Sequence, residues 1–189
     1  MNFNLKNKKV LITGSSGGIG SSLSKIFLKM ECKIIFTSSD NNKLNELKNK
    51  FGNENTYYLL NLSDLNSLPS SISKITEENT DIDIFINNAG ISKDNLFLRM
   101  KVDQWNEVIN VNLNSNFFIL KSILPNMIKN KKGNIIGITS VVANTGADSA
   151  AVHIAMDIFL DIYREVKVGD VFTQNLFNCY FFYEDCARP

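Results

Sequence analysis

The sequence predicts an α/β fold, a doubly wound parallel sheet with helices on both faces in αβα layers. The first observation is that short apolar runs alternate with longer stretches of helical periodicity along most of the chain. The second is that these runs are apolar at nearly every position, as strands buried on both faces are. Strands that alternate with helices are joined by right-handed crossovers, so neighbouring strands should be parallel.

A glycine-rich turn links the first predicted strand, residues 9–12, to the first helix. The turn, residues 13–20, reads Thr-Gly-Ser-Ser-Gly-Gly-Ile-Gly. Gly14 would let the chain leave the strand sharply, Gly18 would let a pyrophosphate approach the backbone, and Gly20 would let the helix pack closely on the strand. The helix N-terminus would offer free N–H groups and partial positive charge to phosphates. A strand, this turn and a helix together predict a Rossmann-type dinucleotide site.

The remaining elements follow the same alternation. Further strands are predicted at residues 33–37, 56–60, 83–86 and 134–140, and further helices at residues 41–51, 64–76 and 102–129. The first helix is expected to bury a stripe made of Leu23, Ile26, Phe27 and Met30. Pro69 is expected to split the third helix near its first turn, and Pro125 to end or kink the long one.

Polar residues gather where three of these strands end. They are residues 13–20, 87–90 and 139–140. In parallel sheets, ligands bind beyond the carboxyl ends of the strands, where the strand order reverses. The coincidence of the three groups in one crevice is the main argument from the residues for a nucleotide site.

Composition narrows the class of protein. The chain has 189 residues and a net charge of +1, which predicts a single globular unit with neither nucleic acid nor a charged membrane as partner. No apolar run is long enough to span a bilayer. The three cysteines match no zinc spacing and are odd in number, so no metal site is predicted and a reducing, cytoplasmic compartment fits.

The composition changes after Gly146. Up to that residue the chain is rich in Asn and Lys, and beyond it both become scarce while aromatic residues gather. We therefore expect a dinucleotide-binding domain at residues 1–146 and a divergent tail at residues 147–189, a helix and an irregular or edge-strand segment packed on the same domain. Truncation, fusion and a shifted reading frame would each explain such a tail.

The motifs together resemble the short-chain dehydrogenase/reductase family. The resemblance rests on the spacing of glycines at residues 13–20, on Asn-Asn-Ala-Gly at residues 87–90, and on Asn112 and Ser140. Within that family, residues 87–101 and 133–146 are similar to bacterial 3-oxoacyl-(acyl-carrier-protein) reductases.

The resemblance implies a role for each matching residue. The pyrophosphate and ribose would lie on the glycine-rich turn, formed by Gly14, Ser15, Ser16, Gly17, Gly18, Ile19 and Gly20. The adenosine end would lie near Ser38, Ser39, Asn61 and Leu62, and the middle of the cofactor along Asn88, Ala89 and Gly90. Ser140 would hydrogen-bond the substrate carbonyl, and Asn112 would hold a water in a proton relay.

The end of the second strand bears on the choice of cofactor. An acid there would bind the ribose 2′-hydroxyl of NAD and repel a 2′-phosphate. The strand instead closes with Ser38 and Ser39, and Asp40 follows. We therefore favour NADP (NADPH) over NAD, although Gly17 stands where the resembled reductases often have a basic residue.

The resemblance breaks at the catalytic pair. The family needs a tyrosine as proton donor and a lysine four residues later on the same helix face, where the ammonium lowers the tyrosine pKa. Those positions hold His153 and Asp157. His153 could itself donate the proton. Alternatively, Tyr163 and Lys167 have the right spacing but lie further along the chain.

Two functions follow from the sequence. The first is an NADP-dependent reductase of 3-oxoacyl thioesters carried on acyl carrier protein, as in fatty acid synthesis. The second is a nucleotide-binding remnant without catalysis, because His153 and Asp157 replace the tyrosine and lysine. The resembled enzymes are tetramers that assemble through the long helix and the catalytic helix, so a homo-oligomer is a further expectation.

Overall fold

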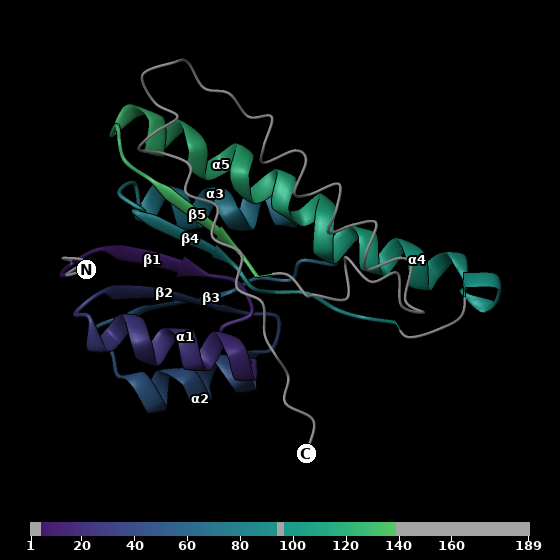
Figure 1. The fold of residues 1–189 in the computed structure, drawn as a ribbon, viewed down its shortest axis with the longest axis horizontal. Coiled ribbons are helices and arrows are strands. Elements are labelled where there is room, and N and C mark those ends of the chain that lie inside the picture. Colours follow the sequence, from purple (N-terminus) through teal and green to yellow (C-terminus); the bar gives the residue numbers. More distant parts are fainter. Residues whose placement is uncertain (1–4, 94–96, 139–189) are drawn as a thin grey trace.

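The computed structural model describes residues 5–93 and 97–138. They form a parallel five-stranded sheet in the order β3-β2-β1-β4-β5 (Figure 1). The strands are β1 Lys9–Ile12, β2 Lys33–Ser38, β3 Thr56–Leu59, β4 Ile84–Asn87 and β5 Asn134–Gly137. The predicted α/β fold with a parallel sheet is therefore confirmed. The predictions for Ser140, for His153 and for the tail at residues 147–189 lie outside the described residues.

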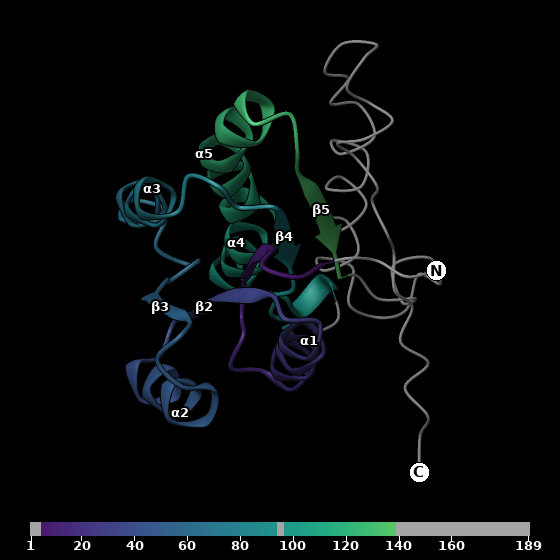
Figure 2. The ribbon, with the colours of Figure 1, turned by 90° about the vertical axis from the view of Figure 1, so that its left-hand side faces the viewer.

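Helices cover both faces of the sheet (Figure 2). Helices α1 (Gly18–Lys29) and α2 (Asn41–Phe51) pack on one face, and α3 (Leu68–Glu78) and α5 (Ser115–Lys129) pack on the other. Successive strand residues point to opposite faces, which divides the core into two layers. In β1, Leu11 belongs to the α3/α5 layer, whereas its neighbours Val10 and Ile12 belong to the α1/α2 layer.

The predicted buried stripe of α1 is wrong in part. Leu23 and Phe27 pack against the core, but Ile26 is 48% exposed and Met30 is 45% exposed. The fully buried residues of α1 are instead Gly20 and Ser24. The close approach of the helix at Gly20 turns this small-residue face inward. Ser24 tolerates burial because its Oγ donates to the Gly20 carbonyl at 2.7 Å.

The third helix begins later than predicted, at Leu68 rather than at residue 64. Asp64 lies before the helix, where its carboxylate accepts hydrogen bonds from the N–H groups of Asn66 (3.2 Å) and Ser67 (3.4 Å). Pro69 occupies the first turn, where a helix does not need the missing N–H. It therefore starts the helix and does not split it.

The predicted long helix has three parts. Helix α4 (Val102–Ile109) is followed by a π-helical segment, Asn110–Asn114, and then by α5. Pro125 lies inside α5 and does not end it. The π segment lies beside the carboxyl edge of the sheet, and π turns of this kind often occur at functional sites.

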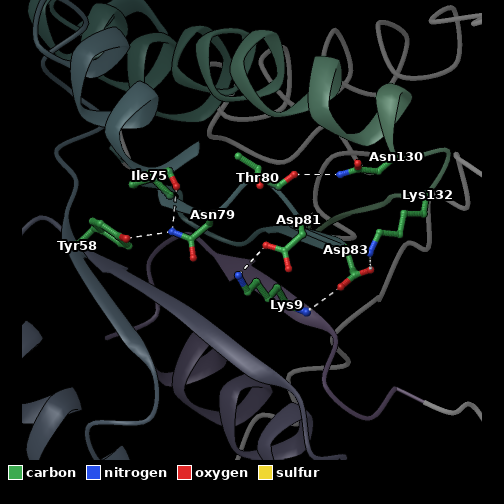
Figure 3. Close-up of polar contacts among 9 residues, drawn as sticks. All are labelled: Lys9, Tyr58, Ile75, Asn79, Thr80, Asp81, Asp83, Asn130 and Lys132. Carbon is green, nitrogen blue, oxygen red and sulfur yellow. Dashed lines mark hydrogen bonds and ion pairs between the residues drawn. The ribbon is translucent and has the colours of Figure 1, made fainter. Parts of the chain in front are cut away.

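A buried carboxylate ties together the opposite, amino edge of the sheet (Figure 3). The side chain of Asp83 is 8% exposed and accepts hydrogen bonds from the Lys9 N–H, from Lys8 Nζ and from Lys132 Nζ, each at 3.0 Å. Burial raises the pKa of this carboxyl, but the three donors outweigh burial and hold the pKa below its ordinary value. Asp83 thus connects the starts of β1 and β4 to the turn before β5.

Candidate functional site

The glycine-rich turn packs directly against the residues that follow β4. Gly14 has a φ of +64°, a left-handed conformation that favours glycine. A Cβ at Gly20 would lie 2.4 Å from the Gly14 carbonyl oxygen and 2.9 Å from Asn88 Nδ2. The sequence therefore uses glycine where β1, α1 and the segment after β4 come together.

Thr13 and Asn88 fix the ends of β1 and β4 to each other. The Thr13 hydroxyl accepts hydrogen bonds from the N–H groups of Asn88 and Ala89, both at 3.1 Å. Asn88 Nδ2 donates to the carbonyls of Thr13 (2.9 Å) and Gly14 (3.2 Å). In the sheet, β1 lies between β2 and β4, and the strand order reverses at β1. These bonds therefore lie where the strand order reverses.

A cleft of about 470 Å³ opens at this point. It brings together nearly all the residues predicted to hold the cofactor, namely Gly14, Ser16, Gly17, Gly18, Ile19, Gly20, Ser38, Ser39, Asn61, Leu62, Asn88, Ala89 and Gly90. The cleft thus runs along the carboxyl edge of the sheet, from the end of β3 past β2 and β1 to the segment after β4. It is a ready place for an elongated ligand.

Ser15 is the predicted cofactor residue that does not line the cleft. It is fully buried, its Oγ donates to the Ile12 carbonyl at 2.7 Å, and it accepts from the Thr37 N–H at 3.0 Å. Its own N–H donates to the Thr37 carbonyl at 3.0 Å. Ser15 therefore joins the ends of β1 and β2 and leaves no side-chain atom for a ligand.

The end of the cleft near β2 contains a basic side chain, Lys43, that was not predicted from the sequence. Lys43, in the first turn of α2, lines the cleft together with Ser16 and Ser38, whose hydroxyls lie 3.0 Å apart. The carboxylate of Asp40 is committed elsewhere, because it caps α2 by accepting from the N–H groups of Asn42 (2.7 Å) and Lys43 (3.2 Å). The signal available in the sequence was the position of Lys43, three residues after a capping aspartate.

Glu107 and Val111 are further lining residues without a sequence prediction. They come from α4 and from the π segment, so they reach the cleft only because those elements cross its end. Glu107 also forms an ion pair with Lys93 at 3.1 Å. This pair connects α4 to the segment that follows Gly90.

Asn112 secures the loop after β4. Its Oδ1 accepts from the Ile91 N–H and its Nδ2 donates to the Ile91 carbonyl, both at 2.9 Å. A Cβ at Gly90 would lie 3.5 Å from the same Oδ1. The side chain of Asn112 therefore positions the wall of the cleft, while the predicted water in a proton relay stays a prediction.

The match to a known protein family covers the residues that form the cleft. The sequence profile of the short chain dehydrogenases matches residues 8–155. The chain belongs to the short-chain dehydrogenase family. The matched range includes every described residue that lines the cleft, and it extends past His153.

Three bacterial proteins are similar in sequence to this short-chain dehydrogenase. The chain is 37% identical over 143 residues to the 3-oxoacyl-(acyl-carrier-protein) reductase FabG of Buchnera aphidicola, covering 76% of this chain and 59% of the relative. It is 36% identical over 152 residues to the reductase of the same name from Escherichia coli, covering 80% and 62%. The reductase of the same name from Chlamydia pneumoniae is 30% identical over 183 residues, covering 95% and 74%. The chain thus spans about three fifths of the length of the first two relatives.

Solved structures support the fold. One short chain dehydrogenase/reductase family protein superposes with a TM-score of 0.84 at 19% identity and covers 96% of this chain and 75% of its own. A protein titled a betaketoacyl-ACP reductase superposes with a TM-score of 0.83, also at 19% identity, covering 95% and 73%. In the part of the chain that the structure describes, no helix is long and apolar enough to cross a membrane.

Proposed function

We propose that this chain binds NADPH across the carboxyl edge of its sheet and acts as a reductase of 3-oxoacyl thioesters carried on acyl carrier protein. The observation that carries the proposal is the cleft at the reversal of strand order, where the predicted cofactor residues converge. The three bacterial relatives, each named a 3-oxoacyl-(acyl-carrier-protein) reductase, supply the substrate class.

The glycine-rich turn fits a pyrophosphate. Gly17 precedes the first residue of α1 and no side chain caps the helix, so its first N–H groups stay available. A Cβ at Gly18 would meet nothing within 4 Å, so the space beside the backbone is open. The first turn of α1 carries no acidic residue that would repel phosphate.

The residues at the end of β2 favour NADP over NAD. The acid that follows β2, Asp40, is engaged as the cap of α2, whereas Ser38, Ser39 and Lys43 line the cleft. A cation and hydroxyl groups bind a 2′-phosphate, whereas a free carboxylate would repel it. Lys43 would thereby bind the 2′-phosphate in place of the basic residue that the resembled reductases often have at the position of Gly17.

The nicotinamide of the cofactor would supply the hydride for the carbonyl carbon. Ser140 would hydrogen-bond the carbonyl oxygen, and a protein acid, with His153 at the expected place, would protonate it. Gly90 and Ile91, held by Asn112, would form the wall beside the reacting end. The exposed Phe117 on α5, 61% accessible, is in keeping with a homo-oligomer that assembles through this helix.

A second candidate is a binding module without catalysis. The observation that favours it is the pair His153 and Asp157, which replaces the tyrosine and lysine that the family uses. An aspartate cannot lower the pKa of a proton donor in the way that an ammonium does. Such a module would bind NADPH in the same cleft and would turn nothing over.

The test separates the two candidates with one pair of proteins. NADPH binding and NADPH oxidation with an acetoacetyl thioester are measured for the unchanged chain and for the double variant His153→Tyr with Asp157→Lys. The reductase proposal predicts binding and turnover by the unchanged chain. Binding without turnover, with activity restored in the double variant, supports the binding module. Absence of NADPH binding by the folded chain overturns both.

A further inference from the structure

A second hollow, separate from the cleft, lies along the outer strand β3. It has a volume of about 470 Å³ and is formed by α2, by α3 and by the segment that leads into β3. Figure 2 shows β3 at the outer edge of the sheet, with α2 and α3 on either side of it. The residues that line the hollow are Lys48, Asn53, Asn55, Thr56, Tyr57, Tyr58, Lys74 and Glu78. None of them lines the cleft, so the proposed function leaves this hollow unused.

Strand β3 leaves one side of its backbone open. It ends the sheet, because the described strands run in the order β3-β2-β1-β4-β5. The Leu60 N–H donates to the Ser38 carbonyl at the end of β2 at 2.8 Å, and alternate residues of a strand turn their backbone groups to the same side. The N–H and carbonyl groups of Tyr57 and Leu59 therefore point away from β2. Such a row of donors and acceptors is a template for a further strand.

Hydrogen bonds within the fold hold the walls of the hollow. The Tyr57 hydroxyl donates to the Gly52 carbonyl at 2.7 Å. The Tyr58 hydroxyl donates to Glu78 Oε2 at 2.7 Å. The same hydroxyl accepts from Asn79 Nδ2 at 2.9 Å (Figure 3). The acid in the lining, Glu78, is therefore engaged by a tyrosine.

Two lysines of the hollow keep their charge available. Lys48 lies near the end of α2, and Lys74 lies in the second half of α3. Both are exposed, and neither forms an ion pair with a residue in the described part of the chain. Since α2 and α3 cover opposite faces of the sheet, one lysine flanks each face of the β3 edge.

An added strand fits the open edge better than a small anion does. The carbonyls of Tyr57 and Leu59 would repel an anion, whereas a peptide backbone offers N–H donors and carbonyl acceptors in turn. Successive side chains of a strand point to opposite faces. Two consecutive acidic residues of an added strand would therefore meet one lysine each.

We propose that the β3 edge binds an extended peptide segment of a partner protein, whose adjacent acidic residues pair with Lys48 and Lys74. Main-chain hydrogen bonds supply affinity, and the two ion pairs supply selectivity. Two copies of this chain that met through their β3 edges would bring their lysines together, and like charges disfavour that pairing. The partner is therefore an acidic segment and not a second copy. This inference goes beyond the proposed function and does not depend on it.

The experiment titrates two peptides of equal composition and charge into the isotopically labelled chain and follows the amide signals by nuclear magnetic resonance. Ser-Thr-Val-Glu-Glu-Val-Thr-Ser has adjacent acids, which point to opposite faces of a strand. Ser-Thr-Glu-Val-Glu-Val-Thr-Ser has them two residues apart, on one face. The first peptide should shift the signals of residues 55–59 and should bind about fivefold more tightly, as expected of one additional exposed ion pair.

Variants separate the contribution of the lysines from that of the backbone edge. Lys48→Glu with Lys74→Glu should bind the adjacent-acid peptide at least about tenfold more weakly and should instead bind Ser-Thr-Val-Lys-Lys-Val-Thr-Ser. Leu59→Pro removes an N–H from the open edge and should also weaken binding. Leu59→Ala keeps this N–H and should bind within about twofold of the unchanged chain. Urea denaturation verifies that each variant is folded, and the charge exchange decides if Leu59→Pro is not.

Several results would overturn the proposal. Unmoved signals at residues 55–59, or equal affinity for the two acidic peptides, would exclude a strand held between two lysines. Undiminished binding of the adjacent-acid peptide by the charge-exchanged chain would do the same. Tripolyphosphate serves as the small polyanion. If it displaces the peptide and a folded Leu59→Pro binds the peptide as the unchanged chain does, the hollow is an anion site and not a strand site.

Discussion

At the scale of single residues, two glycines of the turn, Gly18 and Gly20, have different surroundings. A Cβ at Gly20 would lie 2.4 Å from the Gly14 carbonyl oxygen, which is backbone and cannot move aside cheaply. A Cβ at Gly18 would enter open space in the cleft. Gly20 allows the close packing of the backbone, and we expect Gly18 to leave room for the ligand.

Gly20→Ala should therefore destabilise the fold by about 1–3 kcal/mol, as overpacking does. Gly18→Ala should leave the free energy of unfolding within about 0.5 kcal/mol and should weaken NADPH binding. Urea denaturation and a fluorescence titration of each variant measure the two effects. Equal losses of stability in both variants would contradict the division of roles.

Lys43 is the residue on which the choice of cofactor depends. Lys43→Gln should weaken NADPH binding by about 10- to 100-fold, because a hydrogen bond to a charged group contributes about 1.5–3 kcal/mol. NADH binding should change little. Lys25→Gln, outside the cleft lining on α1, is the matched control. Equal losses for NADPH and NADH in Lys43→Gln would show that the lysine does not read the 2′-phosphate.

At the scale of elements, Asp83 joins strands at the edge of the sheet opposite the cleft. The three donors around it keep its pKa in the folded state below the value of an unfolded aspartate. A carboxyl with a lowered folded pKa stabilises the fold above its unfolded pKa of about 3.9, and this contribution is lost as the pH falls through the folded pKa.

Asp83→Asn should lower the free energy of unfolding at pH 7 by about 1.5–3 kcal/mol. Below about pH 4 the difference from the unchanged chain should shrink. Asp81→Asn is the control, since Asp81 is 51% exposed and its ion pair with Lys9 should contribute at most about 1 kcal/mol. Chemical denaturation between pH 3 and 7 measures these differences. A constant difference for Asp83→Asn across that range would contradict the assignment.

Some of the helices and strands could be predicted from the sequence, and others could not. The strands and α2 follow from local pattern: the helix predicted at residues 41–51 is α2 at the same bounds. The π segment does not follow from local sequence pattern, because it accompanies the contact between Asn112 and Ile91, which are distant in sequence. The buried face of α1 was missed for a similar reason, since the approach of Gly20 to Asn88 decides which face turns inward.

For the site, the sequence predicted the residues whose backbone lines the cleft, because glycines and Asn-Asn-Ala-Gly mark close approach of chains. It could not distinguish Ser16, which faces the cleft, from Ser15, which joins β1 to β2. Two serines in succession look alike until the neighbouring strand is in place. Lys43 was missed because its use depends on Asp40 being engaged as a cap.

At the scale of the whole molecule, the amino edge and the carboxyl edge of the sheet have different roles. The amino edge is held by Asp83, and the carboxyl edge carries the cleft. A second hollow lies beside the outer strand β3, lined by Lys48, Asn53, Asn55, Thr56, Tyr57, Tyr58, Lys74 and Glu78. The proposed function assigns the dinucleotide to the first hollow and nothing to the second.

Hydrogen–deuterium exchange with and without saturating NADPH tests this assignment most directly. NADPH should slow exchange at residues 13–20 and 88–91 and leave exchange at residues 53–58 unchanged. Exchange that is unaffected at residues 13–20, or protection confined to residues 53–58, would contradict a dinucleotide site at the carboxyl edge of the sheet.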